Sequence, residues 1–499
     1  MPAPGGLSPR QLRIPAFGRW RRLAGAAALA ALMGVAPAGA CAAVVGPLRA
    51  QAFNADPGWQ GVHNRLRGLG CRTTSQAFGF SQTRFTSPTG AEIGGRIWNS
   101  YTQAYYAKVL ARPFTLSNVL SASGTLMIAR GSARSGGIRP LNAGALFGFF
   151  NSASRDWRTP NSLVFRFEEK LPGRFAIGPE YGTRTYRASG QWLVPRPGHG
   201  YLRTGSRYRW SLRYDPAAAA GRGRISFSIA GVGTTALILG PGHRRQGAVF
   251  DRFGLLNRML EGNDVTAYFG DLTLNGVRQR PAPAGGGWEG RGNQASFLDC
   301  LLDNRQDFGY TAGGAPGVPA GAIGGVVWRT EANRPGFSAY YADRVGPLNL
   351  NRPIYAAGTV QLVRASSDSA VNFGFFRAGS GGAGDKAPRN FVGVGTDGPS
   401  RVGFYFRPVF RSSRGRVRRP DVGPTIMPNG AVHRWTLRWV PRASGGGVIT
   451  ATLDGRASSQ LIPPADRAAG ATLDRFGIRN VTVGGHAQVI YLDNLRYST

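Results

Sequence analysis

The sequence predicts an all-β protein: two tandem antiparallel β-sandwich (jelly-roll) domains that follow a signal peptide. Three observations support this prediction. The 499 residues contain a long internal duplication, short segments of alternating apolar and polar residues recur throughout, and no amphipathic helix of three turns is found beyond the N-terminal leader. Clusters of Gly, Pro, Asn and Ser separate the alternating segments, as in sandwiches made of many short strands.

The N-terminus has the residue order of a secretory signal peptide. Five arginines precede residue 23, the apolar run 23–35 follows, and the small residues Ala38 and Ala40 end the segment. We therefore expect residues 1–40 to be removed and the mature protein to be secreted or periplasmic. An uncleaved anchor is the less favoured alternative, because the apolar run is shorter than the ~20 residues that cross a bilayer. No other apolar run is long enough to predict a membrane span.

Three cysteines remain to be explained. The segment ending in Cys41 resembles a bacterial lipobox, although Ala38 stands where that motif usually has Leu. Lipidation of Cys41, which would anchor the protein to the outer membrane, is therefore a hypothesis. Cys71 and Cys300 occupy matching positions of the two repeats, and we expect two free or buried thiols because a bond would cross from one domain to the other.

The duplication pairs residues in a constant order along the chain. Trp59 matches Trp288, 229 positions later, and the segment 209–214 matches 434–439, 225 positions later. A period of this length means that each copy is a whole domain rather than one unit of a solenoid. The boundaries are a first jelly-roll repeat over residues 48–277, a Pro/Gly linker over residues 278–287 and a second jelly-roll repeat over residues 288–499.

Strands are expected where apolar and polar residues alternate with a period of two. The segments 224–229 and 448–453 alternate most clearly, and the second ends in Asp454-Gly455, a hairpin turn signal. Further strands are expected at residues 163–167, 210–214, 402–406 and 435–439.

Two shared motifs suggest a relative. Each copy has Arg-Trp-x-Leu-Arg-aromatic, at 209–214 and 434–439, and then Asp-Arg-Phe-Gly, at 251–254 and 474–477. In these motifs the chain resembles concanavalin A-like (laminin-G-like) jelly rolls of secreted bacterial proteins. The resemblance implies the fold but not one function, because that fold hosts lectins, carbohydrate-binding modules, glycosidases, lyases and spacers.

The resemblance also implies a structural Ca²⁺ near the terminal strands, and no other cofactor is expected. The acids of the closing segments, Asp271 and Asp493, are the candidate metal ligands. Ca²⁺ takes 6–8 oxygen ligands, usually with several carboxylates, whereas Gly270 aligns with Asp493 and Asp271 with Asn494, so each copy keeps one acid. The alternative is a carboxylate that pairs with backbone amides or with an arginine at a strand end.

A pair of catalytic carboxylates is not evident. Glycosidases need two acids that face the sugar, and neighbours on a strand such as Glu168 and Glu169 point to opposite faces. These acids and Glu180 are expected to be solvent-exposed or paired with arginines. The histidines lack metal-ligand spacing and no Gly-x-Ser-x-Gly motif is present, so no catalytic residue is assigned.

The most suggestive segment is both aromatic and basic. Residues 402–410 are rich in aromatic residues, and five arginines follow between 411 and 419. Aromatic faces stack on sugar rings, and guanidinium groups pair with carboxylate or sulfate. The alternative is a solvated loop above ordinary buried strand aromatics. The ligand-binding candidates from both copies are Tyr181, Arg184, Tyr186, Trp192, Tyr405, Arg407, Arg411, Arg414 and Arg416.

These features favour a secreted, non-catalytic protein that binds carbohydrate or cell-surface glycan and prefers anionic polysaccharide. Two alternatives stay open: a structural or adhesive surface protein, and a glycosidase or polysaccharide lyase, for which Arg184 and Tyr186 would be the first candidates. Nucleic acid is not an expected partner, because no recognition motif is present. The net charge of +36, with 58 arginines and three lysines, reflects scarce acids as much as abundant arginines.

Overall fold

The computed structural model describes residues 46–499 except 67–71, 89, 101, 130–142, 156–158, 186, 194–200, 261–262, 300–304, 314–318, 331–337, 366–367, 382–383 and 399–402. The predicted signal peptide, Cys41, Cys71, Cys300 and Tyr186 lie outside the described residues. The described residues form 33 strands and two short helices, α1 (His243–Gln246) and α2 (Pro464–Ala468), and the strand ladders are antiparallel. The predicted all-β fold is confirmed.

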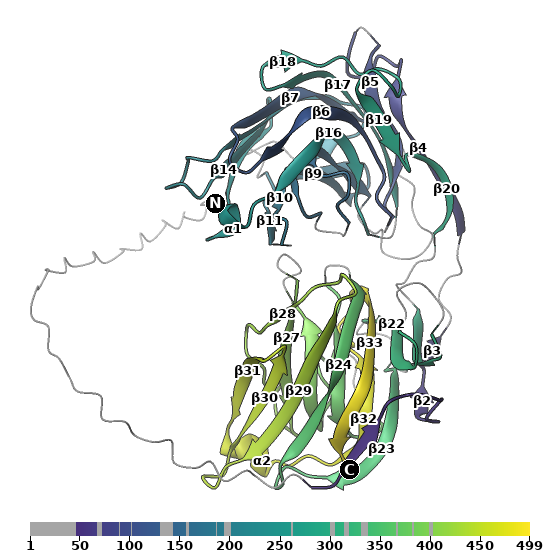
Figure 1. Cartoon of the computed structure of the whole chain (residues 1–499), viewed down its shortest axis with the longest axis vertical. Coiled ribbons are helices and arrows are strands. Elements are labelled where there is room, and N and C mark those ends of the chain that lie inside the picture. The colour runs from purple at the N-terminus through teal and green to yellow at the C-terminus, as the bar shows by residue number, and fades with distance from the viewer. Residues whose placement is uncertain are drawn as a thin grey trace, which may run out of the picture. The chain divides into compact units, whose positions relative to one another are not determined.

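Two sheets pack face to face to form the first sandwich, called sandwich I (Figure 1). Its core joins side chains from both sheets, among them Phe147, Phe165, Trp210 and Phe269. In order across the first sheet, the strands are β15 (Gly233–Ile238), β14 (Arg224–Ile229), β13 (Arg207–Asp215), β7 (Leu120–Ile128), β17 (Asp264–Leu274), β5 (Glu92–Trp98), β4 (Arg72–Ser81) and β20 (Gln294–Asp299), with β18 (Val277–Arg278) paired to β17. The second sheet contains β11 (Ala188–Gly190), β10 (Arg174–Gly182), β9 (Ser162–Leu171), β8 (Gly144–Phe150), β16 (Val249–Asn257), β6 (Tyr105–Thr115) and β19 (Trp288–Arg291), with β12 (Leu202–Arg203) paired to β10.

Sandwich II repeats this order of strands, except that β27 has one short edge strand as partner, where β10 has two. Its core includes Phe373, Phe406, Trp435 and Trp439. The first sheet contains β3 (Arg65–Leu66), β21 (Gln306–Thr311), β22 (Ala322–Trp328), β33 (Ala487–Ser498), β24 (Ile354–Ala365), β29 (Val432–Pro441), β30 (Gly447–Leu453) and β31 (Arg456–Ile462), with β1 (Leu48–Gln51) paired to β33. The second sheet contains β2 (Gln60–Val62), β23 (Tyr340–Leu348), β32 (Leu473–Asn480), β25 (Val371–Phe376), β26 (Phe391–Asp397), β27 (Phe404–Arg411) and β28 (Thr425–Ile426).

The alternating segments form the expected strands because one face of each sheet is buried. On β14, Ile225, Phe227 and Ile229 point into the core, while the serines between them are half-buried. The predicted turn joins β30 to β31, with φ of 49° at Asp454 and 78° at Gly455. Asparagine, aspartate and glycine tolerate such positive φ values better than other residues.

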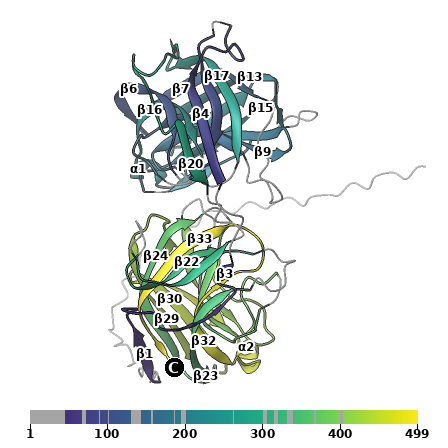
Figure 2. The ribbon, with the colours of Figure 1, turned by 90° about the vertical axis from the view of Figure 1, so that its right-hand side faces the viewer.

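The first strands of the two repeats lie in the opposite sandwiches. β19 and β20, which open the second repeat, pair with β6 and β4 of sandwich I. β2 and β3, the corresponding strands of the first repeat, pair with β23 and β21 of sandwich II. Figure 1 shows the purple β2 among the later strands of sandwich II, and Figure 2 shows the green β20 beside β4.

The repeat boundaries at 48–277 and 288–499 therefore describe the duplication of the sequence, whereas the sandwiches divide the chain elsewhere. Sandwich I is formed by strands between residues 72 and 299, and sandwich II by strands at 48–66 and after 305. The predicted linker 278–287 packs on sandwich I, where the Tyr106 hydroxyl donates to the Ala282 carbonyl over 2.6 Å.

This division corrects one premise about the two internal cysteines. The expectation of two free or buried thiols assumes that a bond between Cys71 and Cys300 would cross from one domain to the other. Their sequence neighbours Arg72 and Asp299 are opposite each other on adjacent strands of one sheet. Peptide mapping under non-reducing conditions tests for the bond directly.

Candidate functional site

The candidate site lies on the outer face of the seven-stranded sheet of sandwich II. Alternation along β27 sends Phe404, Phe406 and Phe410 into the core and places Tyr405, Arg407 and Arg411 on the other face. The predicted segment is thus divided by its strand: the phenylalanines are the buried aromatics of the alternative interpretation, and the tyrosine and arginines face outward.

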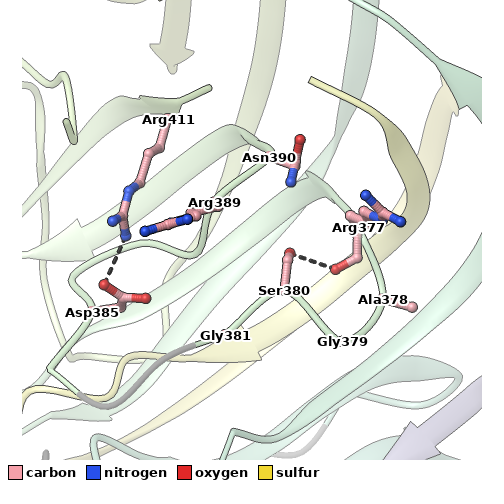
Figure 3. A pocket seen from close by; sticks show the side chains of 9 residues that line it. All are labelled: Arg377, Ala378, Gly379, Ser380, Gly381, Asp385, Arg389, Asn390 and Arg411. Carbon is pink, nitrogen blue, oxygen red and sulfur yellow. Dashed lines mark hydrogen bonds and ion pairs between the residues drawn. The ribbon is translucent and has the colours of Figure 1, made fainter. Parts of the chain in front are cut away.

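One pocket of about 610 Å³ lies at the Arg411 end of this face (Figure 3). We call it the arginine pocket. Its lining residues come from the loop after β25, the loop before β26 and the end of β27: Arg377, Ala378, Gly379, Ser380, Gly381, Asp385, Arg389, Asn390 and Arg411.

Protein groups hold the Arg411 guanidinium in place. It donates to the Asp385 carboxylate and to the Ala387 carbonyl over 2.7 Å each, and to the Gly415 carbonyl over 3.2 Å. Arg377 and Arg389, in contrast, are exposed, and among the described residues neither guanidinium has a hydrogen-bond or ion-pair partner. The pocket thus contains three arginines and one aspartate, and two of the arginines are available to a ligand.

A fourth arginine, Arg479 on β32, lies buried behind the loop that lines the pocket. It donates to the Ser380 carbonyl over 3.2 Å and to the Ser338 hydroxyl over 2.9 Å, and it lies over the Phe376 ring. Within the described part of the chain it has no carboxylate at ion-pair distance. Burial lowers the pKa of Arg479 to about 10, although Asp385 and Tyr340 oppose the shift. The side chain is still charged at neutral pH and adds positive potential behind the pocket.

A second pocket of about 320 Å³ lies along the same strand and is lined partly by Tyr405, Arg407, Asp397 and Arg419. Arg407 is buried and donates to Asp397 over 2.5 and 3.0 Å and to the Pro420 carbonyl over 2.9 Å. Arg419 also contacts Asp397. These contacts anchor the loop after β27 to the sheet, so Arg407 is a positioning residue here and Tyr405 offers the half-buried aromatic surface.

The remaining arginines of the basic loop have different surroundings. Arg418 pairs with Asp466 over 2.6 Å, whereas Arg414 and Arg416 are exposed and have no partner among the described residues. Sequence reasoning missed Arg377, Arg389 and Arg479, because they lie outside the basic run in the sequence. The connection between β25 and β26 and the strand β32 bring them near it only in the folded chain.

The candidates from the first repeat do not gather in one place. Tyr181 faces the core, where its hydroxyl lies 2.8 Å from His243 Nδ1 and accepts from the Gly240 amide. This placement corrects the expected ligand contact, because alternation on β10 turns the ring inward. Arg184 is exposed, and Trp192 is half-buried with the Arg166 guanidinium 4.1 Å from its ring centre.

Trp192 covers a buried network of charges on β9, β10 and the end of β16. Glu168 lies 3.0 Å from Arg258 and 3.7 Å from Arg166, and Glu180 lies 3.2 Å from Arg166. Burial alone would raise the pKa of Glu168, but the charges of Arg258, Arg166 and Lys170 outweigh it and lower the pKa to about 2. Glu168 and Glu180 are thus both paired with arginines, which is one of the two alternatives expected from the sequence. Both acids are buried rather than exposed to solvent.

The two candidate calcium ligands have other partners. Asp271 lies 3.6 Å from Arg278, and Asp493 accepts hydrogen bonds from the backbone and side chain of Asn494. In the part of the chain that is described, no three Asp, Glu, His or Cys side chains gather as a metal site would require. The surroundings match the alternative interpretation of these acids, and calcium stays a prediction that melting temperatures with and without chelator would test.

We next compared the chain with known proteins. No protein-family model and no curated protein matches the sequence. Among solved structures, the chain is similar to domains LG4–5 of the mouse laminin α1 chain, with 11% identity, a TM-score of 0.23 and coverage of 81% of this chain and 89% of that one. It is also similar to the Emp47p carbohydrate recognition domain, with 15% identity, a TM-score of 0.24 and coverage of 39% and 87%.

A third similar structure is the endo-β-1,4-glucuronan lyase of the fungus Trichoderma reesei, with 14% identity, a TM-score of 0.25 and coverage of 39% and 86%. TM-scores of this size carry no argument about function. The strand order itself defines the class: two antiparallel β-sandwiches of the jelly-roll kind. Across the described residues, no helix has both the length and the apolar character needed to cross a membrane.

Proposed function

We propose that this protein binds polysaccharide on the outer face of β26 and β27 in sandwich II, and that it prefers acidic polymers. The arginine pocket is the main support: the exposed guanidinium groups of Arg377 and Arg389 face open space and have no partner among the described residues. Guanidinium groups bind carboxylate and sulfate through paired hydrogen bonds. The single acid of the pocket, Asp385, is already paired with Arg411.

The arrangement along β27 favours a polymer over a single sugar. Tyr405 lines one pocket and Arg411 the other, and both lie on the same face of one strand. Six residues of strand span about 20 Å, which leaves room for several sugar units in a row. Tyr405 would stack on a sugar ring, and the arginine pocket would hold an acidic group further along the chain.

Secretion, the signal peptide at 1–40 and lipidation of Cys41 belong to the same proposal, because a cell-envelope polysaccharide is met outside the cytoplasm. Mass spectrometry of the mature N-terminus tests them together. An unmodified Ala or Cys there contradicts the lipid anchor, and an intact Met1 contradicts the cleavage.

The binding proposal is tested with neutral and acidic polysaccharides in affinity electrophoresis. Replacing Arg377 and Arg389 together by Ser should weaken binding to the acidic polymers by at least about 100-fold, since each lost charged hydrogen bond contributes roughly 1.5–3 kcal/mol. Arg209 and Arg213 on β13 are also exposed, so the double variant Arg209→Ser/Arg213→Ser removes the same charge elsewhere.

If binding to acidic polymers falls equally in both double variants, the effect is one of general charge. Unchanged binding in the variant Arg377→Ser/Arg389→Ser would exclude the arginine pocket as the site. Release of reducing ends or of unsaturated sugars during incubation would replace the binding proposal by an enzyme.

A further inference from the structure

We propose that the two halves of this chain, 46–283 and 284–499, hold each other by donated strands, so that their association does not depend on the covalent segment that joins them. Each half places strands in the sandwich formed mainly by the other half. The interaction surface of each half is the sheet edge that receives these strands.

The first donation closes sandwich I. Trp288 on β19 is buried and lies nearly parallel to the Tyr106 ring, with ring centres 6.2 Å apart. Glu289 accepts from Arg252 over 2.7 Å and from the Tyr105 hydroxyl over 2.6 Å. These contacts sit on the ladder between β19 and β6, and β20 forms a second ladder with β4.

The second donation closes sandwich II. Trp59, just before β2, packs against Phe53, Tyr341 and Tyr497 in the core of sandwich II. Arg65 on β3 pairs with Asp307 over 2.6 Å. The N-terminal strand β1 adds a further ladder along β33.

The two donations use the same residues of the repeat for the same contacts. Asn64 donates to the Phe308 carbonyl over 2.5 Å, and Asn293 donates in the same way to the Phe78 carbonyl. The backbone carbonyls of the two asparagines accept from Phe308 and Phe78 in return, over 3.0 and 3.1 Å. The corresponding glycines Gly61 and Gly290 leave space for these side chains, because a Cβ atom would meet the asparagine Oδ1 at 2.3 Å in each.

This equivalence makes each donated pair of strands a module that fits either sandwich. Two modules that connect the same two halves act together, because both must leave before the halves separate. A module from a second copy of the chain would fit the same sheet edges. The alternative arrangement is therefore a pair of copies in which each chain donates its strands to the other.

The test cuts the chain between the halves. Pro283 and Ala284 are exposed, so a specific protease site is inserted between them in the full chain, and the folded protein is cleaved. With reductant present throughout, so that no bond between Cys71 and Cys300 joins the halves, we expect two bands in a denaturing gel and one native species with the mass of the intact chain. Two separate native species would overturn the proposal, and a native mass twice that of the chain would assign the exchange to a pair of copies instead.

A variant of the cleaved protein sharpens the result. Trp288→Ala should speed separation of the halves by about 100-fold or more, because the substitution empties a large buried apolar site on the donated strand. Leu298→Ala on β20 is the matched control, because Leu298 is an exposed apolar residue on the same donated segment. Equal rates for the two variants would contradict the proposed contact.

If Trp288→Ala does not fold, amide hydrogen exchange in the uncut wild-type protein tests whether the donated strands are held. Amides of β20 that point to β4 should exchange as slowly as those of β4 that point to β5. Fast exchange on β20 beside slow exchange on β4 would show that the module is not held, and would overturn the proposal.

Discussion

Arg377 and Arg407 have the same side chain and belong to the same repeat, yet their surroundings give them different roles. Arg407 is buried and holds Asp397 and the Pro420 carbonyl, whereas Arg377 is exposed at the rim of the arginine pocket. A guanidinium whose donors are all used by the protein positions structure, and one without partners can meet a ligand. Sequence alone could not separate the two cases.

Glu168 provides a prediction at the same scale. The substitution Glu168→Gln leaves Arg166 and Arg258 buried with less compensating charge, so it should lower the free energy of unfolding by about 3–5 kcal/mol. Urea denaturation measures the loss. Asp421→Asn, at an exposed aspartate, is the control, and a comparable loss there would contradict the role of the buried network.

The same carboxylate predicts a pH dependence. The pKa of Glu168 is lowered from 4.5 to about 2 in the folded protein, so its contribution to stability is present above about pH 4.5 and is lost as the pH falls toward 2. Unfolding free energies measured between pH 5 and pH 2 should fall more steeply in the wild type than in Glu168→Gln. Parallel curves would assign the acid sensitivity to other groups.

At the scale of elements, long alternating strands could be predicted and short edge strands could not. The segment 224–229 is a strand with the bounds expected from its pattern. β2 has three residues and β3 has two, which is too short for a period to be recognised. The match of Trp59 with Trp288 is recognisable as a repeat, but the place of these segments at a sheet edge depends on partners 180 or more residues away.

The donated strands yield a prediction about single hydrogen bonds. Asn293→Ala removes the side-chain bond to the Phe78 carbonyl and should destabilise the protein by about 1 kcal/mol. Thermal unfolding measures the change, and Ser296→Ala, at an exposed position of β20, should have no comparable effect. Equal melting temperatures for Asn293→Ala and the wild type would show that this hydrogen bond does not contribute to stability.

At the scale of the whole molecule, the two sandwiches share their strand order but differ on their outer faces. In sandwich I this face contains the Glu168 network under Trp192, and in sandwich II it contains the two pockets. The duplication thus kept the core and varied the surface, which is why the proposed binding site is placed in the second sandwich.

The division of the chain predicts which fragment folds. A fragment of residues 72–299 contains the strands of sandwich I, whereas the repeat 48–277 lacks β19 and β20 and leaves Tyr106 and Phe78 without their edge partners. We expect cooperative thermal unfolding from 72–299 and a broad, weak transition from 48–277. Equal transitions would show that the donated strands are dispensable.

The fold class and the duplication can be predicted from the amino-acid sequence alone, because alternation along a strand and repetition along the chain are patterns that do not depend on which segments later pack together. The folded chain is needed to see which sandwich receives each opening pair of strands, which arginines already have protein partners, and that Arg377 and Arg389 line one pocket with Arg411. These features depend on contacts between residues far apart in the chain, and sheet edges, burial and charge pairing exist only once the chain has folded.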